Sequence, residues 1–301
     1  HFVNGIEIIG AYDSDHNNLK DYISLHNLPN AYNSFNELLA DVNAVYIATP
    51  HLSHYEYCKQ ALLAKKHVLC EIPLVLEEEQ ASELYALAET QGVVLMEAHK
   101  TAHCPAFNHL ITLVKSGLIG DVVGIDASES KLWDRSDLKR ELDPKQAGGS
   151  LYEMGSYPLL PIVKLLGTQQ RDVMLYSRLN SDGVDIYTRG MMLCERGVGS
   201  FQLGLGVKTE GNLVISGTRG YAYVPSPWWK TDYFELRYED QNQNKKYFYK
   251  WDEPGLRYEI QEFVSCIVNG RSRSARLTPK ESIAMARVME QFTNRKNFFE
   301  L

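Results

Sequence analysis

A carboxylate stands directly after a short apolar run early in this chain of 301 residues. The run spans residues 67–70 and is followed by Glu71, Ile72 and Pro73. Such a run is typical of a strand buried in a parallel sheet, and the proline bars its continuation as a helix. Because open α/β sheets bind ligands at the carboxyl ends of their strands, we expect Glu71 to face a binding site.

A second apolar run, residues 44–48, ends in the same way at Thr49 and Pro50, and His54 follows shortly after. Residues 55–65, which lie between the two runs, have the length of one helix. Two parallel strands joined by one helix form a right-handed βαβ unit. The carboxyl ends of both strands should therefore lie at one edge of the sheet.

Two histidines four residues apart, His99 and His103, precede Cys104 and follow Glu97. These residue types at this spacing are used in zinc sites, where two histidines project from one face of a helix. Pro105 follows at once, however, so the segment is not a long helix. We expect no metal here.

Strand-like and helix-like segments alternate over the first hundred residues. Besides the two strands above, strands are expected at residues 5–12 and 93–98. Helices are expected at residues 17–26, 33–39 and 77–91. This alternation predicts a doubly wound parallel sheet.

The pattern changes after Pro105. One helix is expected at residues 106–116 and another at 150–166, and two more close the chain at 256–269 and 279–295. The strand-like runs between them are residues 122–131, 173–178, 186–195, 199–205, 212–216, 220–224, 234–240 and 245–251. So many strands with few helices indicate an α+β domain on a large, mostly antiparallel, open-faced sheet.

These elements predict two domains. The first comprises residues 1–102 and is completed by residues 279–301, and the second comprises residues 103–278. An apolar content of 44% is ample for their cores.

Composition excludes several classes of protein. The net charge is −7 and no block of lysine and arginine stands out, so we expect no nucleic-acid partner. No apolar run approaches the roughly 18–20 residues that cross a bilayer, so we expect no membrane span. The five cysteines are odd in number and scattered, and no signal peptide is visible, which indicates reduced thiols and a cytoplasmic protein.

Two patterns, T-P-x-x-x-H at residues 49–54 and H-V-L-C-E-x-P at residues 67–73, resemble the Gfo/Idh/MocA family of glucose-fructose oxidoreductase and inositol dehydrogenase. The resemblance implies a Rossmann-like α/β domain, here incomplete at its N-terminus, followed by the α+β domain. It also implies nicotinamide-dependent oxidation or reduction of a sugar, polyol or sugar derivative. Thr49, Pro50, His54, Glu71 and Pro73 should then line the cofactor. The family has Glu-Lys-Pro where this chain has Ile72, and that lysine is the family's usual catalytic residue.

A second pattern, at residues 148–160, resembles the family helix G-G-x-x-x-D-x-G-x-H-x-x-D that lines the substrate pocket. Glu153 stands at the first aspartate, Tyr157 at the histidine and Leu160 at the last aspartate. Relatives with tyrosine at the histidine position use it as the proton donor, so the resemblance implies this role for Tyr157 and a substrate contact for Glu153. The other interpretation is that Tyr157 is a half-buried helix aromatic whose hydroxyl finds a backbone partner.

Transfer of a hydride from a carbinol requires a group that moves the hydroxyl proton and a cation that stabilises the alkoxide. Ile72 can do neither. We hypothesise that Lys100, just past the carboxyl end of the strand at residues 93–98, replaces the missing lysine, with Tyr157 as its acid–base partner. Glu97, expected close to the substrate, is an alternative base. The other interpretation of Lys100 is a solvated loop residue with no catalytic role.

Asp13 ends the expected strand at residues 5–12. In a Rossmann unit the acidic residue at this position accepts hydrogen bonds from the adenosine ribose and repels a 2′-phosphate, which favours NAD over NADP. The alternative is a solvated, helix-capping turn at residues 13–15. No G-x-G-x-x-G precedes Ile6, so we expect that one βα unit of roughly 25–30 residues, carrying the diphosphate loop, is missing from this sequence.

The partners that the resemblance implies are a sugar-like small molecule and further copies of the chain. The open face of the second-domain sheet is expected to form a homodimer or homotetramer. Trp228, Trp229 and Phe234 are interpreted as part of such an interface, with sugar stacking as the alternative. The competing hypothesis for the whole chain is a non-catalytic member of the family that acts as a ligand-binding or assembly subunit.

Overall fold

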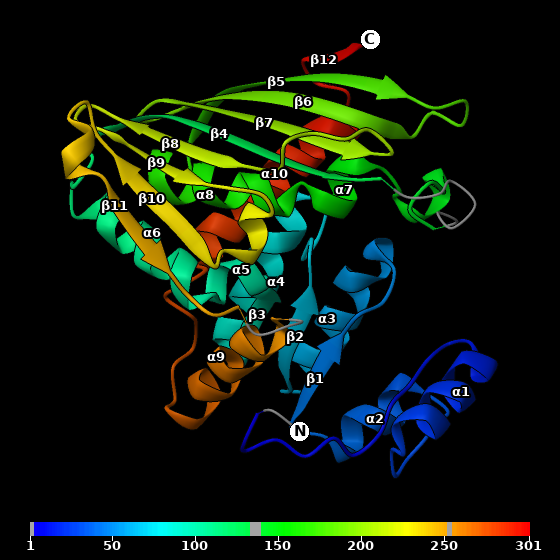
Figure 1. The fold of residues 1–301 in the computed structure, drawn as a ribbon. Coiled ribbons are helices and arrows are strands. Elements are labelled where there is room, and N and C mark those ends of the chain that lie inside the picture. The colour runs from blue at the N-terminus through cyan, green and yellow to red at the C-terminus, as the bar shows by residue number, and fades with distance from the viewer. Residues whose placement is uncertain (1–2, 133–139, 252–254) are drawn as a thin grey trace.

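The computed structural model describes residues 3–132, 140–251 and 255–301. In these ranges the chain forms a small parallel sheet of order β1-β2-β3 and a large sheet of order β11-β10-β9-β8-β4-β7-β6-β5-β12 (Figure 1). The large sheet is mostly antiparallel, with parallel pairs at β4–β7 and β12–β5. The predicted fold class is confirmed.

The helices are α1 (His16–His26), α2 (Phe35–Asp41), α3 (His54–Leu63), α4 (Glu78–Gln91), α5 (Lys100–His103), α6 (Pro105–Lys115), α7 (Ser150–Met154), α8 (Ser156–Leu166), α9 (Leu256–Val268) and α10 (Pro279–Thr293). The strands are β1 (Ala44–Ile47), β2 (His67–Glu71), β3 (Leu95–Ala98), β4 (Val122–Lys131), β5 (Gln170–Leu179), β6 (Asp185–Cys194), β7 (Val198–Leu205), β8 (Leu213–Gly217), β9 (Tyr221–Val224), β10 (Tyr233–Arg237), β11 (Lys245–Phe248) and β12 (Phe298–Glu300). In the described ranges, none of these helices is long and apolar enough to cross a membrane.

Helices cover both faces of the small sheet. Cys58 and Ala61 of α3 and Leu84 of α4 share a buried cluster with Val68 of β2, and Phe263 of α9 packs with Leu69 on the other face. Neighbouring residues of a strand point to opposite faces, which explains why β2 is apolar throughout. This two-sided burial holds the carboxyl ends of all three strands at one edge.

The helices of the second domain lie on one side of the large sheet (Figure 1). α8 packs against β4 and β7, and α10 packs against β5. The main core of the protein lies between these elements and includes Phe107, Leu159 and Phe201, which are fully buried. Packing on a single side leaves the other face of the sheet open, as predicted.

The prediction of a strand at residues 5–12 is wrong. Only Ala11 forms a bridge, to Ala31, and Ile6 and Ile8 are 44% and 65% exposed. A strand is stable only when its backbone groups find a neighbouring strand, and in the described ranges this segment has no more than the bridge. The apolar sequence alone did not reveal that requirement.

The helix predicted at residues 150–166 is present as two helices, α7 and α8, which meet at Gly155. Pro158 has no N–H to donate to the carbonyl of Met154, so the hydrogen-bond ladder is interrupted where α8 begins. The first residue of α8, Ser156, lies beside the end of β3, where its carbonyl is 3.1 Å from Nε2 of His99.

Helix α10 packs against α4 of the first domain and α8 of the second. Thr278 and Glu281 form a capping box at its start, and Arg287 pairs with Glu78 at 2.7 Å. Lys164 of α8 lies 3.0 Å from Glu281. α10 therefore contacts helices of both packing units.

The interface interpretation of Trp228 and Phe234 is wrong, because both side chains are fully buried in one chain. The indole Nε1 of Trp228 donates to the carbonyl of Ser128 at 3.0 Å. Buried tryptophan needs a partner for its N–H, and the sheet supplies it within the chain.

Candidate active site

Two backbone turns lie at the carboxyl edge of the small sheet, one after β1 and one after β2, and His54 joins them. Its Nδ1 lies 2.9 Å from the carbonyl of Pro73, and its Nε2 lies 2.8 Å from the carbonyl of Thr49. The ring is buried at the start of α3. The structure therefore brings Thr49, Pro50, His54 and Pro73 together, and it holds the two turns in a fixed relation.

Glu71 lies at the end of β2, in the same group. Its carboxylate accepts a hydrogen bond from the hydroxyl of Tyr46 in β1, and burial together with the charge of Glu71 raises the pKa of that phenol. Ile72 follows Glu71 directly, is partly buried and packs against the core of the second domain. An aliphatic side chain thus occupies the place where the family carries its lysine.

Lys100 and Tyr157 are neighbours. Lys100 is the first residue of α5, directly after β3, and its Nζ lies 5.7 Å from the centre of the Tyr157 ring. His99 packs edge-on against the same ring, with 5.0 Å between the ring centres, and its Nε2 lies 3.1 Å from the carbonyl of Ser156. An ammonium group over a phenol ring at this distance is attracted to its face.

Burial raises the pKa of the Tyr157 phenol well above its ordinary value, and the nearby carboxyls of Glu129, Glu71 and Glu259 add to the rise. The phenol is therefore a proton donor in its resting state. A cation beside a neutral phenol is the arrangement that transfer of a hydroxyl proton requires.

Glu153 lies one helical turn before Tyr157, in α7, and contacts the first domain. Its carboxylate accepts a hydrogen bond from Arg140 at 2.9 Å, and Nε2 of His51 lies 3.8 Å away. Burial raises the pKa of Glu153, and the adjacent Arg140 opposes the rise. Burial lowers the pKa of His51 to about 4. Glu153 thus lies at the junction of the two domains.

Glu97 lies near the end of β3, three residues before Lys100. It is fully buried, its Oε1 accepts the backbone N–H of Leu74 at 3.1 Å, and burial raises its pKa to about 7. These contacts place it beneath the turn that follows Pro73. We propose that Glu97 supports this turn.

The two histidines with zinc-like spacing, His99 and His103, are both buried. In the ranges that the structure describes, no group of three or more histidine, cysteine, aspartate or glutamate side chains has the geometry to hold a metal ion.

Asp13 is exposed, and its Oδ1 accepts the backbone N–H of Asp15 at 2.8 Å. Asp15 in turn caps α1 by accepting from Asn17 and Asn18. The segment thus has the capping turn that the sequence offered as one alternative. The other oxygen of an exposed carboxylate remains open to solvent-side donors, so the ribose role of Asp13 stays a prediction.

Sequence analysis missed Glu129, which joins this group from β4. Glu259, in the first turn of α9, is a second carboxyl near Lys100 and Tyr157. Both are buried and act electrostatically on Lys100 and Tyr157. Glu129 lies within a strand whose neighbours Ser128 and Ser130 are also buried. The sequence signal that could have identified Glu129 is the run of polar residues 128–130 within an expected strand, because polar residues that a strand buries often have a functional role.

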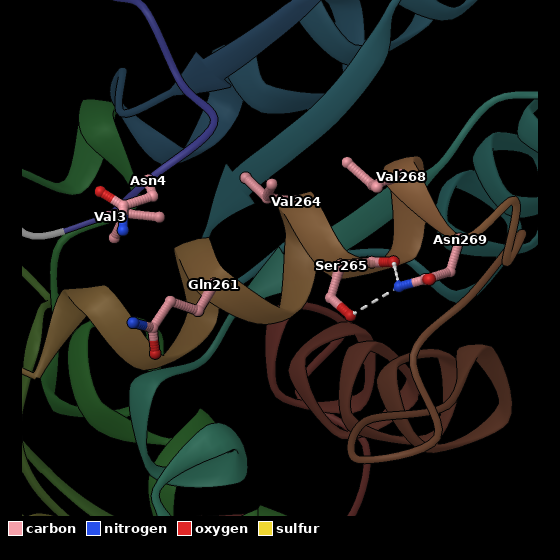
Figure 2. Close-up of a pocket in the computed structure, with 7 residues that line it drawn as sticks. All are labelled: Val3, Asn4, Gln261, Val264, Ser265, Val268 and Asn269. Carbon is pink, nitrogen blue, oxygen red and sulfur yellow. Dashed lines mark hydrogen bonds between the residues drawn. The ribbon is translucent and has the colours of Figure 1, made fainter.

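A hollow of about 300 Å³ lies elsewhere, between the N-terminal segment and α9 (Figure 2). Val3 and Asn4 face Val264 and Val268 across it, and Asn269 at its end donates to Ser265. None of its lining residues belongs to the group around Lys100 and Tyr157. We therefore do not assign the candidate site to this hollow.

Family models match both parts of the chain. A model described as an oxidoreductase family with an NAD-binding Rossmann fold matches residues 1–99. A model described as the GFO/IDH/MocA C-terminal domain matches residues 107–223.

Characterised relatives match along most of the chain. Trans-1,2-dihydrobenzene-1,2-diol dehydrogenase of Oryctolagus cuniculus is 29% identical over 295 residues, which cover 95% of this chain and 89% of the rabbit protein. Scyllo-inositol 2-dehydrogenase (NADP(+)) IolU of Bacillus subtilis (strain 168) is 28% identical over 298 residues, which cover 96% of this chain and 89% of the bacterial protein.

Solved structures share the fold. A 3-ketoreductase from Actinomadura kijaniata, in complex with NADP and TDP-benzene, superimposes with a TM-score of 0.84 at 20% identity and covers 98% of this chain and 91% of its own. Levoglucosan dehydrogenase, in complex with NADH and levoglucosan, gives a TM-score of 0.82 at 17% identity and covers 94% of this chain and 86% of its own. With both family models matched in order along one sequence, the chain belongs to the Gfo/Idh/MocA family of oxidoreductases, with a Rossmann-fold N-terminal domain and the family's C-terminal domain.

Proposed function

We propose that this protein is an NAD(P)-dependent dehydrogenase that transfers a hydride between nicotinamide and a CH–OH group of a sugar, polyol or sugar derivative. The observation that carries the proposal is the contact between Lys100 and Tyr157 at the carboxyl end of β3. The names of the relatives support it, because they act on a dihydrodiol and on an inositol.

The residues at the sheet edge fit the nicotinamide half of a dinucleotide. Thr49, Pro50 and Pro73 would hold it, because their turns are fixed by His54 and lie beside the Lys100–Tyr157 pair in the same edge of the sheet. The bound nicotinamide ring supplies the hydride acceptor or donor. Asp13 would bind the adenosine ribose and favour NAD, although related proteins are named for NADP and for NADH.

The proposed work of the chain is proton transfer and charge stabilisation. Tyr157 donates its phenolic proton to a carbonyl oxygen in reduction and takes a proton back in oxidation. Lys100 lowers the energy of the oxyanion that develops between these states and of the phenolate left behind. In this assignment Lys100 takes the role of the lysine that the family carries where this chain has Ile72.

The alternative function is a non-catalytic ligand-binding or assembly subunit. Its supporting observation is the position of Ile72, which packs against the second-domain core rather than presenting a charge. A protein of this kind would keep the fold and the turns without turning over a substrate.

Titration of the full-length protein with NADH and NADPH, followed by nicotinamide fluorescence, tests the cofactor assignment. We expect tight binding of NADH and weaker binding of NADPH, and Asp13→Ala should reduce the difference between them. If a folded sample binds neither nucleotide, the dehydrogenase proposal fails and the assembly subunit becomes the better hypothesis.

Kinetics of variants test the catalytic pair. Lys100→Ala and Tyr157→Phe should each lower kcat by about 10²–10⁴-fold, while the affinity for NADH stays near that of the wild type. Lys115→Ala, which removes an exposed lysine in α6, is the matched control. Unchanged turnover in Lys100→Ala would refute its role.

A rescue experiment separates the two cation positions. Ile72→Lys places a lysine where the family carries one, so it should restore part of the activity that Lys100→Ala loses. Continued inactivity of a folded double variant would show that position 72 no longer faces the reacting group.

The remaining proposals concern the chain as a whole. We propose the domain limits 1–102 with 279–301 and 103–278, with α10 packed between the two. We also propose a cytoplasmic location, which the five free and buried cysteine thiols support.

A further inference from the structure

Two buried carboxyl groups near Lys100 have oxygens without a hydrogen-bond partner in the described part of the chain. Glu129 in β4 is 6% exposed and its Oε2 has no partner. Glu259 in α9 is 1% exposed, and neither of its carboxyl oxygens has one. Buried polar groups in folded proteins are almost always hydrogen-bonded, so two such groups in one place need an explanation.

The two groups belong to one site. Lys100 favours the charged form of both carboxyls, and both raise the pKa of Tyr157. Glu129 and Ala127 are two residues apart in β4 and therefore point to the same, helix-covered face of the sheet. β4 packs against α8, which carries Tyr157. Glu259 lies in the first turn of α9, which packs against β2, β3 and α5, the short helix that begins with Lys100.

Neither group is explained by the architecture of the core. An unpaired carboxyl in an apolar interior costs free energy, and residues such as leucine or methionine would fill the same volume at no such cost. Burial raises the pKa of both carboxyls well above the ordinary value. A protonated carboxyl both donates and accepts a hydrogen bond, and an alcohol hydroxyl does the same.

We propose that Glu129 and Glu259 bind hydroxyl groups of the substrate close to the carbon that reacts beside Lys100 and Tyr157. This inference rests on the proposed function and adds a substrate class to it. The substrate carries at least two hydroxyls near the reacting carbon, and it has no carboxylate or phosphate at those positions. An anionic group there would lose its hydration in a buried site, beside two carboxyl groups whose own charged forms are disfavoured.

Ligand binding by the full-length, NADH-loaded protein tests the inference. The probes are myo-inositol, D-glucose, their deoxy analogues and D-glucuronate, measured by calorimetry. We expect the polyhydroxylated, uncharged probes to bind better than D-glucuronate. Glu129→Met and Glu259→Met should each weaken binding of the preferred probe by about 10–100-fold, the usual effect of losing a hydrogen bond to a charged or acidic group.

The deoxy analogues identify the contact. An analogue that lacks the hydroxyl bound by Glu129 should bind weakly to the wild type, and Glu129→Met should not weaken its binding further. The same holds for Glu259→Met and the analogue that lacks the other hydroxyl. Glu89→Gln, which changes an exposed carboxylate in α4, is the control and should leave every affinity unchanged.

A second readout does not depend on turnover. If the carboxyls serve a ligand rather than the fold, each methionine variant should raise Tm of the ligand-free protein by roughly 2 °C or more. A fall in Tm, or unchanged affinity for the preferred probe, would overturn the inference. If the wild-type protein does not bind NADH, the proposed function is refuted instead. The Tm values of the wild type and the two methionine variants would still decide whether the carboxyls stabilise the fold.

Discussion

Gly149 shows how tightly a single residue in the second motif is constrained. Its φ of +133° is rarely adopted by residues with a side chain, and a Cβ there would lie 2.0 Å from Oδ1 of Asp185. The other oxygen of Asp185 accepts from the hydroxyl of Ser150, the backbone N–H of Leu151 and the hydroxyl of Thr188. Asp185 thus anchors the start of α7, and the glycine leaves room for it.

We expect Gly149→Ala to lower the free energy of unfolding by about 2–4 kcal/mol, because the methyl group must displace a buried carboxyl whose other oxygen accepts three hydrogen bonds. Gly183→Ala is the matched control: its φ is +80° but nothing lies within 4 Å of the added carbon. The control should cost only about 1 kcal/mol of backbone strain. Urea unfolding of both variants measures the difference, and equal losses would contradict the steric argument.

His103 makes stability depend on pH. Burial, together with the charges of His99, Arg276 and Lys164, lowers its pKa to about 3. Since an unfolded histidine has a pKa near 6.5, the unfolded chain takes up the proton first as pH falls. His103 therefore costs no stability above about pH 7, and it should cost about 2 kcal/mol at pH 5.

The variant His103→Phe should reduce this loss, because phenylalanine cannot take up a proton. Urea unfolding at pH 7.5 and pH 5.0 gives the slope for the wild type, the variant and His16→Gln, which changes an exposed histidine at the start of α1. The same pH dependence in the wild type and His103→Phe would show that other groups cause it.

At the scale of elements, His54 couples the two strand-end turns that we assign to the cofactor. A neutral imidazole donates from one nitrogen, yet carbonyls lie within 3 Å of both. The ring therefore joins the turns that follow β1 and β2 through contacts that no apolar residue reproduces.

We expect His54→Ala to lower the free energy of unfolding by about 1–3 kcal/mol, because a buried carbonyl loses its donor. Hydrogen exchange should become faster at residues 49–53 and 73–75, and slower binding of NADH should accompany it. His16→Ala, at an exposed helix position, should change neither. Local exchange that matches the wild type would mean that the turns hold their shape without the ring.

At the scale of the whole molecule, the open face of the large sheet is the expected contact between copies of the chain. Met191 and Leu193 of β6 and Val198 of β7 are 45%, 44% and 40% exposed, and Leu193 pairs with Val198. An exposed apolar patch on a sheet face is typical of a symmetric protein interface.

The double variant Met191→Glu with Leu193→Glu should therefore lower the mass in solution to that of one chain, because each copy places two charges in the interface. Light scattering coupled to size exclusion measures the mass. Leu25→Glu, at a 75% exposed position of α1, is the control. A wild type that is already monomeric would refute the predicted dimer or tetramer.

Much of the fold could be predicted from the sequence because it depends on local pattern. The apolar runs that end at Glu71 and Ala98 are strands because their neighbours along the chain supply a helix and a proline at the right distance. The motif around Tyr157 and the strand end before Lys100 were enough to suggest that these two residues meet. Their roles remain predictions that kinetics must decide.

Other features depended on groups distant in the sequence. The apolar segment at residues 5–12 is not a strand, since no neighbouring strand accepts its backbone groups in the described ranges. Trp228 can be buried because the carbonyl of Ser128 accepts a hydrogen bond from its indole N–H. Glu129 and Glu259 come from β4 and α9, and only folding brings them to Lys100. Local pattern sets the propensity of a segment, whereas hydrogen bonding and burial are properties of the partners that the tertiary structure supplies.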